Sequence, residues 1–363
     1  MAMKARTLVG LDVHARQTHA AVVDPVSGEV RVRKLLGAPE EVVPFLVGLG
    51  RDVMAVYEAG PTGFGLARVG GQRGIDVRVV APGSVPRGAG DRVKTDKRDA
   101  IRLVRLLAAG ELRFVFVPTV EDERFRDLVR CIEDLRGDLM RARHRLGKLL
   151  LRHGERYPGR GSAWTLKHMR WLQALRLADP CSQATLADYL SAVELLVARR
   201  RALLATLEQT LPEVSHAPVI ARLRCFRGID TLTAAGLCAE IGEWRRFPRP
   251  TLLSGFLGIV PSERTSDTKR RQGSITKAGS PHARRLLVEA AHHYRRPPRI
   301  GETLACRQAG QDPRVIAIAW RAQRRLYQRW QHLLGHRRKP SSVVAIACAR
   351  ELASFVWEAA TLD

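Results

Sequence analysis

The stretch Thr7-Leu8-Val9-Gly10-Leu11-Asp12 is a short apolar run that ends in a carboxylate. Its composition is typical of a buried strand, and Asp12 would then lie at the end of that strand. A second run, Val53-Met54-Ala55-Val56-Tyr57-Glu58, follows the same plan and ends in Glu58. The two runs therefore predict a sheet that carries acidic side chains at its strand ends.

Around these runs, strand-like and helix-like stretches alternate, with Gly and Pro at the joints. Further strands are expected at 20–23, 30–33 and 77–81, and helices at 39–49, 62–69 and 96–109. This alternation predicts an α/β layer structure over residues 1–118, from which 113–118 leads out.

Asp96 and Asp99 lie one helical turn apart and would share one face of the last of these helices. Together with Asp12 and Glu58 they form a set of four carboxylates. Mg²⁺ prefers oxygen ligands, and a pair of ions can stabilise both the attacking and the leaving oxygen of a phosphoryl transfer. The set therefore predicts a metal site for Mg²⁺, with Mn²⁺ as the alternative.

Each acid also has an ordinary structural explanation. Asp96 fits the N-cap of its helix and Asp99 the first turn, where the helix dipole favours negative charge. Asp12 could be a plain strand-end acid, as could Glu58. Asp24 and Asp91 compete more weakly for the metal-binding role.

The formal net charge of +25 decides which partners to expect. The basic residues are spread over the whole chain, and such a field concentrates polyanions. DNA or RNA is therefore the first candidate partner. Acids that hold metal, in a chain that attracts phosphates, predict a metal-dependent enzyme that acts on nucleic acid.

Other partners and compartments are disfavoured. No apolar run approaches the ~20 residues needed to span a bilayer, and no N-terminal stretch has the order of a signal peptide. The cysteines are dispersed without a Cys-x-x-Cys pair, so that neither a zinc knuckle nor a disulfide framework is expected. We expect no membrane partner and a reducing cytoplasm.

In residues 119–218 the spacing of the apolar residues differs from that of the first 118 residues. Apolar side chains alternate three- and four-residue steps over more than three heptads, at positions 125, 128, 132, 135, 139, 142, 146 and 149. Gly154–Gly161 breaks the pattern, and a return helix is expected over Leu186–Leu211, with Arg200 interrupting its stripe. The pattern predicts a coiled coil or a long helical hairpin, and intramolecular and intermolecular pairing both remain open.

The sequence of residues 219–363 predicts a mainly helical domain. Its first segment, 226–237, has a glycine turn between short apolar helices, which resembles a helix-hairpin-helix whose backbone amides bind a DNA phosphate. A basic loop is expected over Val260–Gly279, followed by helices at about 281–295, 313–334 and 341–359.

The expected basic loop can bind phosphates through Arg264, Lys269, Arg270, Arg271 and Lys277. A serine there would become a nucleophile only if a base or metal activated it, and no histidine lies close in sequence. On its own, the loop favours a phosphate-binding role. The histidines lack metal-ligand spacing with cysteine and are interpreted as surface, core or phosphate contacts: His14, His19, His282, His292 and His293.

Segments along nearly the whole chain resemble one known family. Gly10-Leu11-Asp12-Val13-His14, Tyr57-Glu58-Ala59-Gly60-Pro61-Thr62-Gly63 and Lys94-Thr95-Asp96-Lys97-Arg98-Asp99-Ala100 come first. Downstream follow 257–261, 273–279, 284–291 and 349–357. In this order the segments resemble the DEDD transposases of bacterial insertion sequences, relatives of the pilin-gene invertases.

The resemblance implies an RNase H-like fold of the RuvC type for residues 1–118, with Asp12, Glu58, Asp96 and Asp99 as a metal-binding quartet. It also implies a catalytic serine in the carboxy-terminal domain, in a Ser-Ser-Gly-like motif.

That motif aligns with Thr265-Ser266-Asp267. Ser266 is therefore the first candidate for the catalytic serine, and Ser262 is the second. Asp267 replaces a glycine, which allows φ > 0 at lower cost. In the family, the serine attacks a DNA phosphodiester, metal activates it, and a phosphoserine–DNA link conserves the bond energy for rejoining.

The resemblance further implies donor and target DNA, a structured bridge RNA that pairs with both, and dimers that assemble into a tetramer. The leading hypothesis is thus an RNA-guided recombinase of the bacterial cytoplasm, associated with the nucleoid. A RuvC-type nuclease that hydrolyses DNA without the serine is the alternative, and a non-enzymatic nucleic-acid-binding assembly protein is the third.

Overall fold

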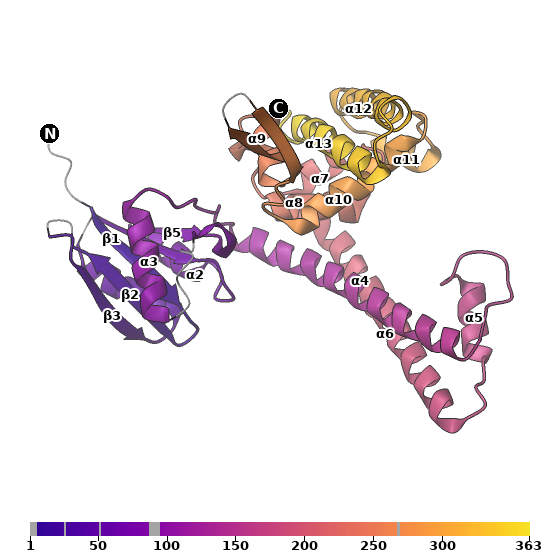
Figure 1. The fold of residues 1–363 in the computed structure, drawn as a ribbon, viewed down its shortest axis with the longest axis horizontal. Coiled ribbons are helices and arrows are strands. Elements are labelled where there is room, and N and C mark those ends of the chain that lie inside the picture. The colour runs from indigo at the N-terminus through magenta and orange to yellow at the C-terminus, as the bar shows by residue number, and fades with distance from the viewer. Residues whose placement is uncertain (1–5, 25–26, 51, 87–94, 267–268) are drawn as a thin grey trace. The chain divides into compact units, whose positions relative to one another are not determined.

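The structure, a computed structural model, describes residues 6–24, 27–50, 52–86, 95–266 and 269–363, and of residues 84, 264–266 and 269–270 it describes the backbone only. The chain forms two compact units, Met1–Thr119 and Val120–Asp363. Each unit is described by itself below (Figure 1).

The first unit is built on a five-stranded sheet with the strand order β3-β2-β1-β4-β5. The strands are β1 Thr7–Val13, β2 Gln17–Val23, β3 Val30–Leu36, β4 Val53–Glu58 and β5 Asp76–Val80. The first three form an antiparallel meander, whereas β4 and β5 run parallel to β1. The sequence predicted all five strands, although β2 begins three residues earlier than expected, at Gln17.

Helices cover both faces of this sheet. On one face, α1 (Val42–Gly48) and α2 (Gly65–Gln72) bury Leu46 and Leu66 against side chains of the central strands, such as Leu11. On the other face lies α3 (Asp96–Ala108), which packs Leu103 against Val56. The predicted α/β class is therefore confirmed for this unit.

Gly10 sets how closely α3 approaches β1. A Cβ atom at Gly10 would lie 2.3 Å from the carbonyl oxygen of Ala100 and 2.6 Å from the amide nitrogen of Val104. Only a residue without a side chain permits this distance between helix and strand backbone. Because side chains alternate along a strand, Asp12 lies on the same face of the sheet as Gly10, beside the start of α3.

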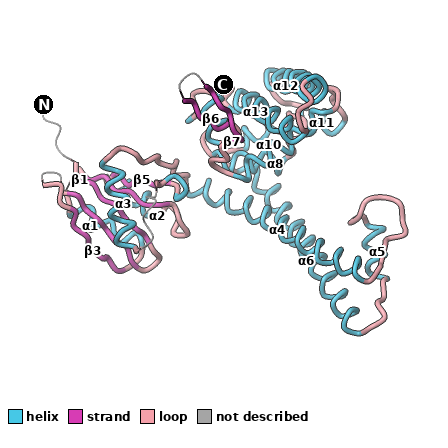
Figure 2. Tube along the Cα trace, viewed as in Figure 1, coloured by secondary structure: helices cyan, strands magenta, loops and turns pink. Residues whose placement is uncertain are grey.

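The second unit begins with α4 (Val120–Arg152), an uninterrupted helix of 33 residues. It contributes to two separate cores. Its first half buries Phe125 and Ile132 in the core of the carboxy-terminal helices, and its second half buries Leu146 against Leu186 and Val193 of α6 (Pro180–Thr210). Figure 2 shows α4 and α6 as helices that lie along each other.

Two features of this region were not predicted from the sequence. Helix α6 begins at Pro180, before the expected Leu186, because Asp179 caps it by accepting a hydrogen bond from the amide of Ser182. A short helix, α5 (Leu166–Ala174), was not predicted and buries Leu172 against the α4–α6 pair.

The remainder is mainly helical, as predicted. It comprises α7 Ala217–Leu223, α8 Thr231–Ile241, α9 Pro250–Phe256, α10 Pro281–Ala291, α11 Glu302–Gln308, α12 Pro313–Gln331 and α13 Ser341–Ala360. The prediction of a basic loop over 260–279 was wrong, because β6 (Pro261–Ser266) and β7 (Lys269–Ile275) pair there as an antiparallel hairpin. Residues 271–274 of β7 are exposed, so that no apolar alternation marked the strand. No helix in the described ranges is long and apolar enough to cross a membrane.

Candidate metal centre

Asp12 stands near the end of β1, on the face of the sheet that α3 covers. Its side chain is 22% exposed. Burial raises the pKa of Asp12, His14 opposes that shift, and the charges of Asp96 and Asp99 raise the pKa further. A carboxylate held among other carboxylates in a half-buried site is poised to bind a cation, because a cation relieves their mutual repulsion.

Asp96 is the first residue of α3, but it is not the N-cap that sequence considerations allowed. Thr95 takes that place and accepts a hydrogen bond from the amide of Arg98 at 3.3 Å. The carboxylate of Asp96 is thus available to other groups. Gln17 donates to it at 3.4 Å, and the ring nitrogens of His14 and His19 lie 3.6 Å from its oxygens.

His19 joins the two acids through the register of the sheet. In the β1–β2 ladder, Asp12 is paired directly with His19. One ligand atom each from Asp12, His19 and Asp96 lies within 4.8 Å of the others. Ligands of a single Mg²⁺ lie about 3–4 Å apart, so that a small inward movement would let all three reach one ion.

A buried polar atom supports this fit. Nδ1 of His19 is buried and makes no hydrogen bond within the described residues. Buried nitrogen atoms of this kind ordinarily have a partner, and a metal ion would supply one. The interpretation of His19 as a surface, core or phosphate contact is therefore incomplete. The signal was present in the sequence, because a tight turn after Val13 makes Asp12 and His19 cross-strand neighbours.

Glu58 ends β4, the parallel neighbour of β1. The register pairs Leu11 with Tyr57, so that Asp12 and Glu58 are the next positions on adjacent strands. Side-chain alternation places both on the α3 face, since Val56 packs against α3 while Tyr57 packs in the core of the opposite face. The structure thus brings the predicted strand-end acids to neighbouring positions, although Glu58 is not part of the three-residue cluster.

Asp99 lies one turn into α3 and is 8% exposed. Its Oδ1 is 3.1 Å from a guanidinium nitrogen of Arg102, and its charge is felt at Asp12. Of the weaker competitors, Asp24 follows the far end of β2 and accepts a hydrogen bond from the amide of Ser27, as a turn residue does. Asp91 lies outside the described residues.

The serine candidates belong to the second unit. Ser266 is the last residue of β6 and pairs with Lys269, beside the turn of the hairpin. Its side chain and those of Arg264, Lys269 and Arg270 lie outside the described atoms, as does all of Asp267. Arg271 and Lys277 are exposed. Ser262, near the base of the hairpin, directs its hydroxyl toward Gly273, where an added Cβ would lie 2.5 Å from Oγ.

A mixed five-stranded sheet with acids at adjacent strand ends and on the facing helix is consistent with an RNase H-like fold. Two family models match the chain. The DEDD transposase model of IS110 elements matches residues 9–154, and the model of the IS116/IS110/IS902 transposase family matches residues 220–304.

Individual relatives extend the match over almost the full length. The y4qE protein of Sinorhizobium fredii is 41% identical over 355 residues, which cover 96% of this chain and 87% of that protein. The transposase for insertion sequence element IS1533 of Leptospira borgpetersenii is 32% identical over 344 residues, or 93% and 99% of the two chains. The chain therefore belongs to the DEDD transposases of the IS110 family. It is a DNA transposase, and its substrates are DNA.

Proposed function

We propose that this transposase cuts and rejoins DNA through a covalent serine–DNA link, using a divalent cation held by Asp12, Asp96 and their neighbours. The observation that carries the proposal is the convergence of Asp12, His19 and Asp96 on one point at the end of the sheet. Mg²⁺ is the proposed ion, with Mn²⁺ as the alternative. Glu58 and Asp99 would complete the ligand set from the adjacent strand and the next helical turn.

Ser266 is the proposed nucleophile. Its hydroxyl would lose its proton and its Oγ would attack a DNA phosphorus, forming a serine O–P bond while the P–O bond to a deoxyribose oxygen breaks and that oxygen takes up a proton. The reverse attack by a strand-end hydroxyl on the phosphoserine would restore the serine and join the new strands. A bound cation would favour these steps by stabilising charge on the phosphate oxygens. The carboxylates of Asp12 and Asp96 would hold the cation.

The β6–β7 hairpin is proposed to bind the DNA backbone beside the nucleophile. Cross-strand pairs place Arg264 next to Arg271 and Thr265 next to Arg270, while Lys269 faces Ser266. Basic residues therefore sit on both strands of the hairpin around the proposed nucleophile. Such charges bind phosphates and offset the charge that develops during strand transfer.

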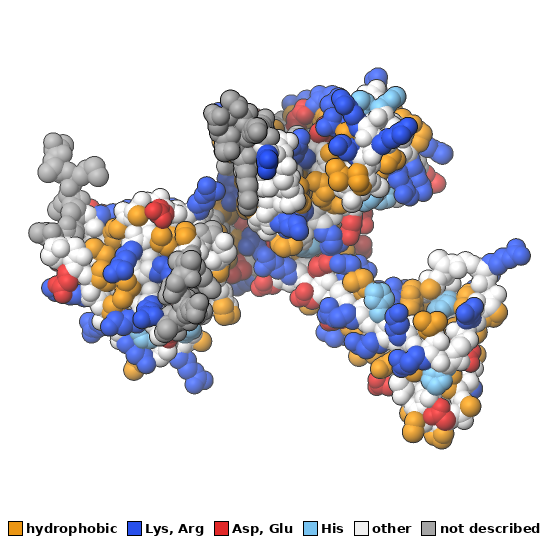
Figure 3. All heavy atoms as spheres, in the orientation of Figure 1, with side chains coloured by type: hydrophobic (Ala, Val, Ile, Leu, Met, Phe, Trp, Pro, Cys, Tyr) orange, Lys and Arg blue, Asp and Glu red, His pale blue; other side chains and the backbone are white. Residues whose placement is uncertain are grey.

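A structured bridge RNA and a tetramer built from dimers complete the proposal. Blue basic side chains are distributed over the units in Figure 3, in keeping with a net charge of +25 that suits two nucleic acids. The region 119–218 is proposed as the assembly element, between domains at 1–118 and 219–363. We place the protein in the cytoplasm, on the nucleoid.

The decisive experiment traps the covalent intermediate. Purified protein is incubated with labelled DNA that carries the element ends, with its RNA and Mg²⁺, and denatured before electrophoresis. A protein–DNA adduct is expected, and it should disappear in Ser266→Ala but persist in Ser262→Ala, a change on the same strand. Full cleavage by Ser266→Ala without an adduct would instead support the hydrolytic RuvC-type nuclease. In either case Asp12→Asn should abolish cleavage.

A further inference from the structure

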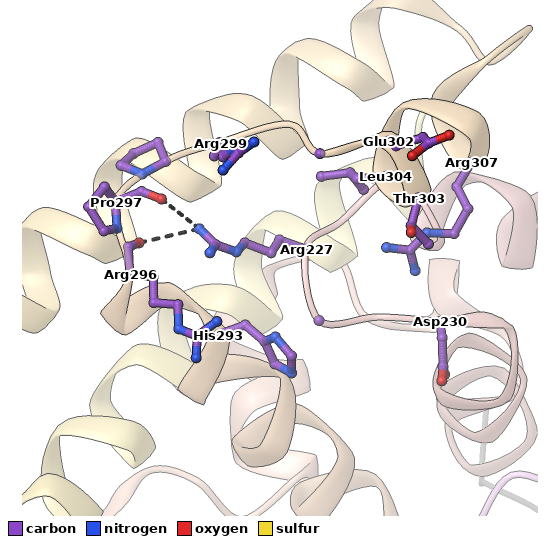
Figure 4. A pocket seen from close by; sticks show the side chains of 13 residues that line it. Arg227, Asp230, His293, Arg296, Pro297, Arg299, Glu302, Thr303, Leu304 and Arg307 are labelled. Atoms are coloured by element: carbon purple, nitrogen blue, oxygen red, sulfur yellow. Dashed lines mark hydrogen bonds between the residues drawn. The ribbon is translucent and has the colours of Figure 1, made fainter.

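A pocket of about 900 Å³ lies in the second unit, where two segments distant in sequence meet. They are the turn before α8 and the stretch 293–307, which runs from the segment after α10 into α11 (Figure 4). Four arginines line it, Arg227, Arg296, Arg299 and Arg307, against two acids, Asp230 and Glu302. The lining therefore has an excess of positive charge in a concave site.

Two of the arginines are fixed by the backbone. Arg227 donates to the carbonyl oxygen of Pro297 at 2.8 Å and to that of Arg296 at 3.3 Å, as the dashed lines in Figure 4 show. Arg307 donates to the carbonyl oxygen of Ile229 at 2.5 Å. Carbonyl oxygens do not neutralise a guanidinium, so both groups keep a full charge in a set position.

The other two arginines are exposed and unengaged. The side chains of Arg296 and Arg299 make no hydrogen bond or ion pair with any described residue. The pKa of His293, which also lines the pocket, is lowered by burial and then by the charges of Arg227 and Arg296. The guanidinium charges of Arg227 and Arg296 that act on this imidazole mark a positive potential in the pocket, which an anion would relieve.

The two acids offset part of this charge but are outnumbered by the four arginines of the lining. Asp230 is the N-cap of α8 and accepts a hydrogen bond from the amide of Thr233 at 2.8 Å. The predicted helix-hairpin-helix-like turn therefore satisfies an α8 amide internally, which leaves the guanidinium groups as the donors for a ligand. The turn itself is fixed by Gly228, where a Cβ would lie 2.8 Å from the carbonyl oxygen of Ala290.

We propose that this pocket binds backbone phosphates of the DNA on which the transposase acts, with Arg296 and Arg299 as the direct contacts and Arg227 and Arg307 as fixed charges behind them. Exposed arginines at a concave surface suit a polymer that lies across it, and guanidinium groups bind phosphate oxygens in pairs. The site is separate in sequence from the basic hairpin, and it rests on the proposed function only in that DNA is the ligand.

The test compares Arg296→Ala/Arg299→Ala with a matched control, Arg324→Ala/Lys339→Ala, in the full chain. The control removes two positive charges from exposed residues of the same unit that do not line the pocket. Binding to a fluorescein-labelled, random-sequence DNA duplex is followed by anisotropy in EDTA over a series of salt concentrations. Both backbone carbonyls that hold Arg227 remain in the pocket variant.

The pocket variant should bind more weakly than the control, and the slope of log K against log [salt] should become shallower by about 1 to 2, since each lost phosphate contact removes ~0.9. Equal losses in the two variants would overturn the proposal, because they would reflect net charge alone. A loss confined to an RNA of the same sequence would overturn the assignment to DNA.

Folding is checked by thermal unfolding, and Arg299→Gln provides a second variant if the double change disturbs it. The assay contains no divalent metal, so that neither the proposed cation nor strand cleavage takes part in it. The binding assay therefore tests the pocket alone, and the covalent-adduct assay tests the cleavage chemistry alone.

Discussion

Asp12 on β1 and His19 on β2 are direct partners in an antiparallel ladder, and both side chains meet Asp96 at the start of α3. Two of these residues come from the same hairpin, and the third comes from a helix that Gly10 allows to pack closely against it. The candidate metal centre is therefore a product of sheet register and helix packing together.

Replacing Asp12 should separate metal binding from stability. In Asp12→Asn, the repulsion from Asp96 and Asp99 is relieved, so that the metal-free protein should be as stable as the wild type or more stable by about 1 kcal/mol. The increase in unfolding temperature that Mg²⁺ or Mn²⁺ gives the wild type should be lost. Differential scanning fluorimetry with and without metal measures both effects, and Asp24→Asn, at the far end of β2, is the control.

His19→Ala should weaken the binding of Mn²⁺ by about tenfold or more, in the range seen when groups that support a metal site are removed. Imidazole is a better ligand for Mn²⁺ than for Mg²⁺, so that the loss should be larger for Mn²⁺. Isothermal titration calorimetry with each ion gives the comparison. His144→Ala removes an exposed imidazole from α4 and should change neither affinity. Unchanged Mn²⁺ affinity in His19→Ala would remove His19 from the ligand set.

Gly10→Ala should destabilise the first unit, because the new methyl group would collide with the backbone of α3. Overpacking of this kind costs about 1–3 kcal/mol. Urea unfolding measures the free energy, and Gly71→Ala is the matched control. A Cβ at Gly71, in the last turn of α2, meets no atom within 4 Å, so that this change should be neutral or stabilising by up to about 1 kcal/mol.

An ion network fastens α4 to the carboxy-terminal helices, and it should give the second unit a marked pH dependence. Arg130 donates to both carboxylate oxygens of Glu240, at 2.9 and 3.1 Å, and His282 lies 3.4 Å from one of them. Burial would raise the pKa of Glu240, but hydrogen bonds from His282 and Arg130 and the charge of Arg130 outweigh it and hold the pKa well below its usual range.

Because the pKa of Glu240 is lower in the folded than in the unfolded state, its stabilising effect is fully present above pH ~4.5 and is lost as the pH falls toward the folded-state value. The free energy of unfolding should therefore fall more steeply below pH ~4.5 in the wild type than in Glu240→Gln. At pH 7 the variant should be less stable by about 1–3 kcal/mol, because charged hydrogen bonds to Arg130, whose side chain is 54% exposed, become neutral ones. Chemical denaturation at several pH values tests this, and equal slopes would contradict it.

The strands and the strand-end acids were predictable because their signals are local. The run from Thr7 to Asp12 is apolar up to its last residue, and the same holds for Val53 to Glu58. Neighbouring parallel strands then bring such ends together without further information. The N-cap was less predictable, because Thr95 and Asp96 are both good capping residues and only the backbone decides between them.

The features that sequence reasoning missed depend on pairing between segments. His19 became a candidate ligand only through its register with Asp12. The β6–β7 hairpin has no apolar face, so that its residues look like a loop until they pair. The arginines around the pocket come from two segments, and nothing in the sequence indicates that Arg227 shares a cavity with Arg296 and Arg307.

The continuity of α4 also has a consequence for how the second unit can vary. Its 33 residues span about 50 Å at 1.5 Å per residue, and one end lies in each of two cores. Removing one residue would rotate the side chains after the deletion by about 100° around the helix axis, relative to those before it. Removing seven residues would return these side chains to nearly their original direction. The length of α4 therefore fixes the rotation between the buried faces at its two ends. We expect insertions and deletions in α4 to be tolerated in whole heptads and not as single residues.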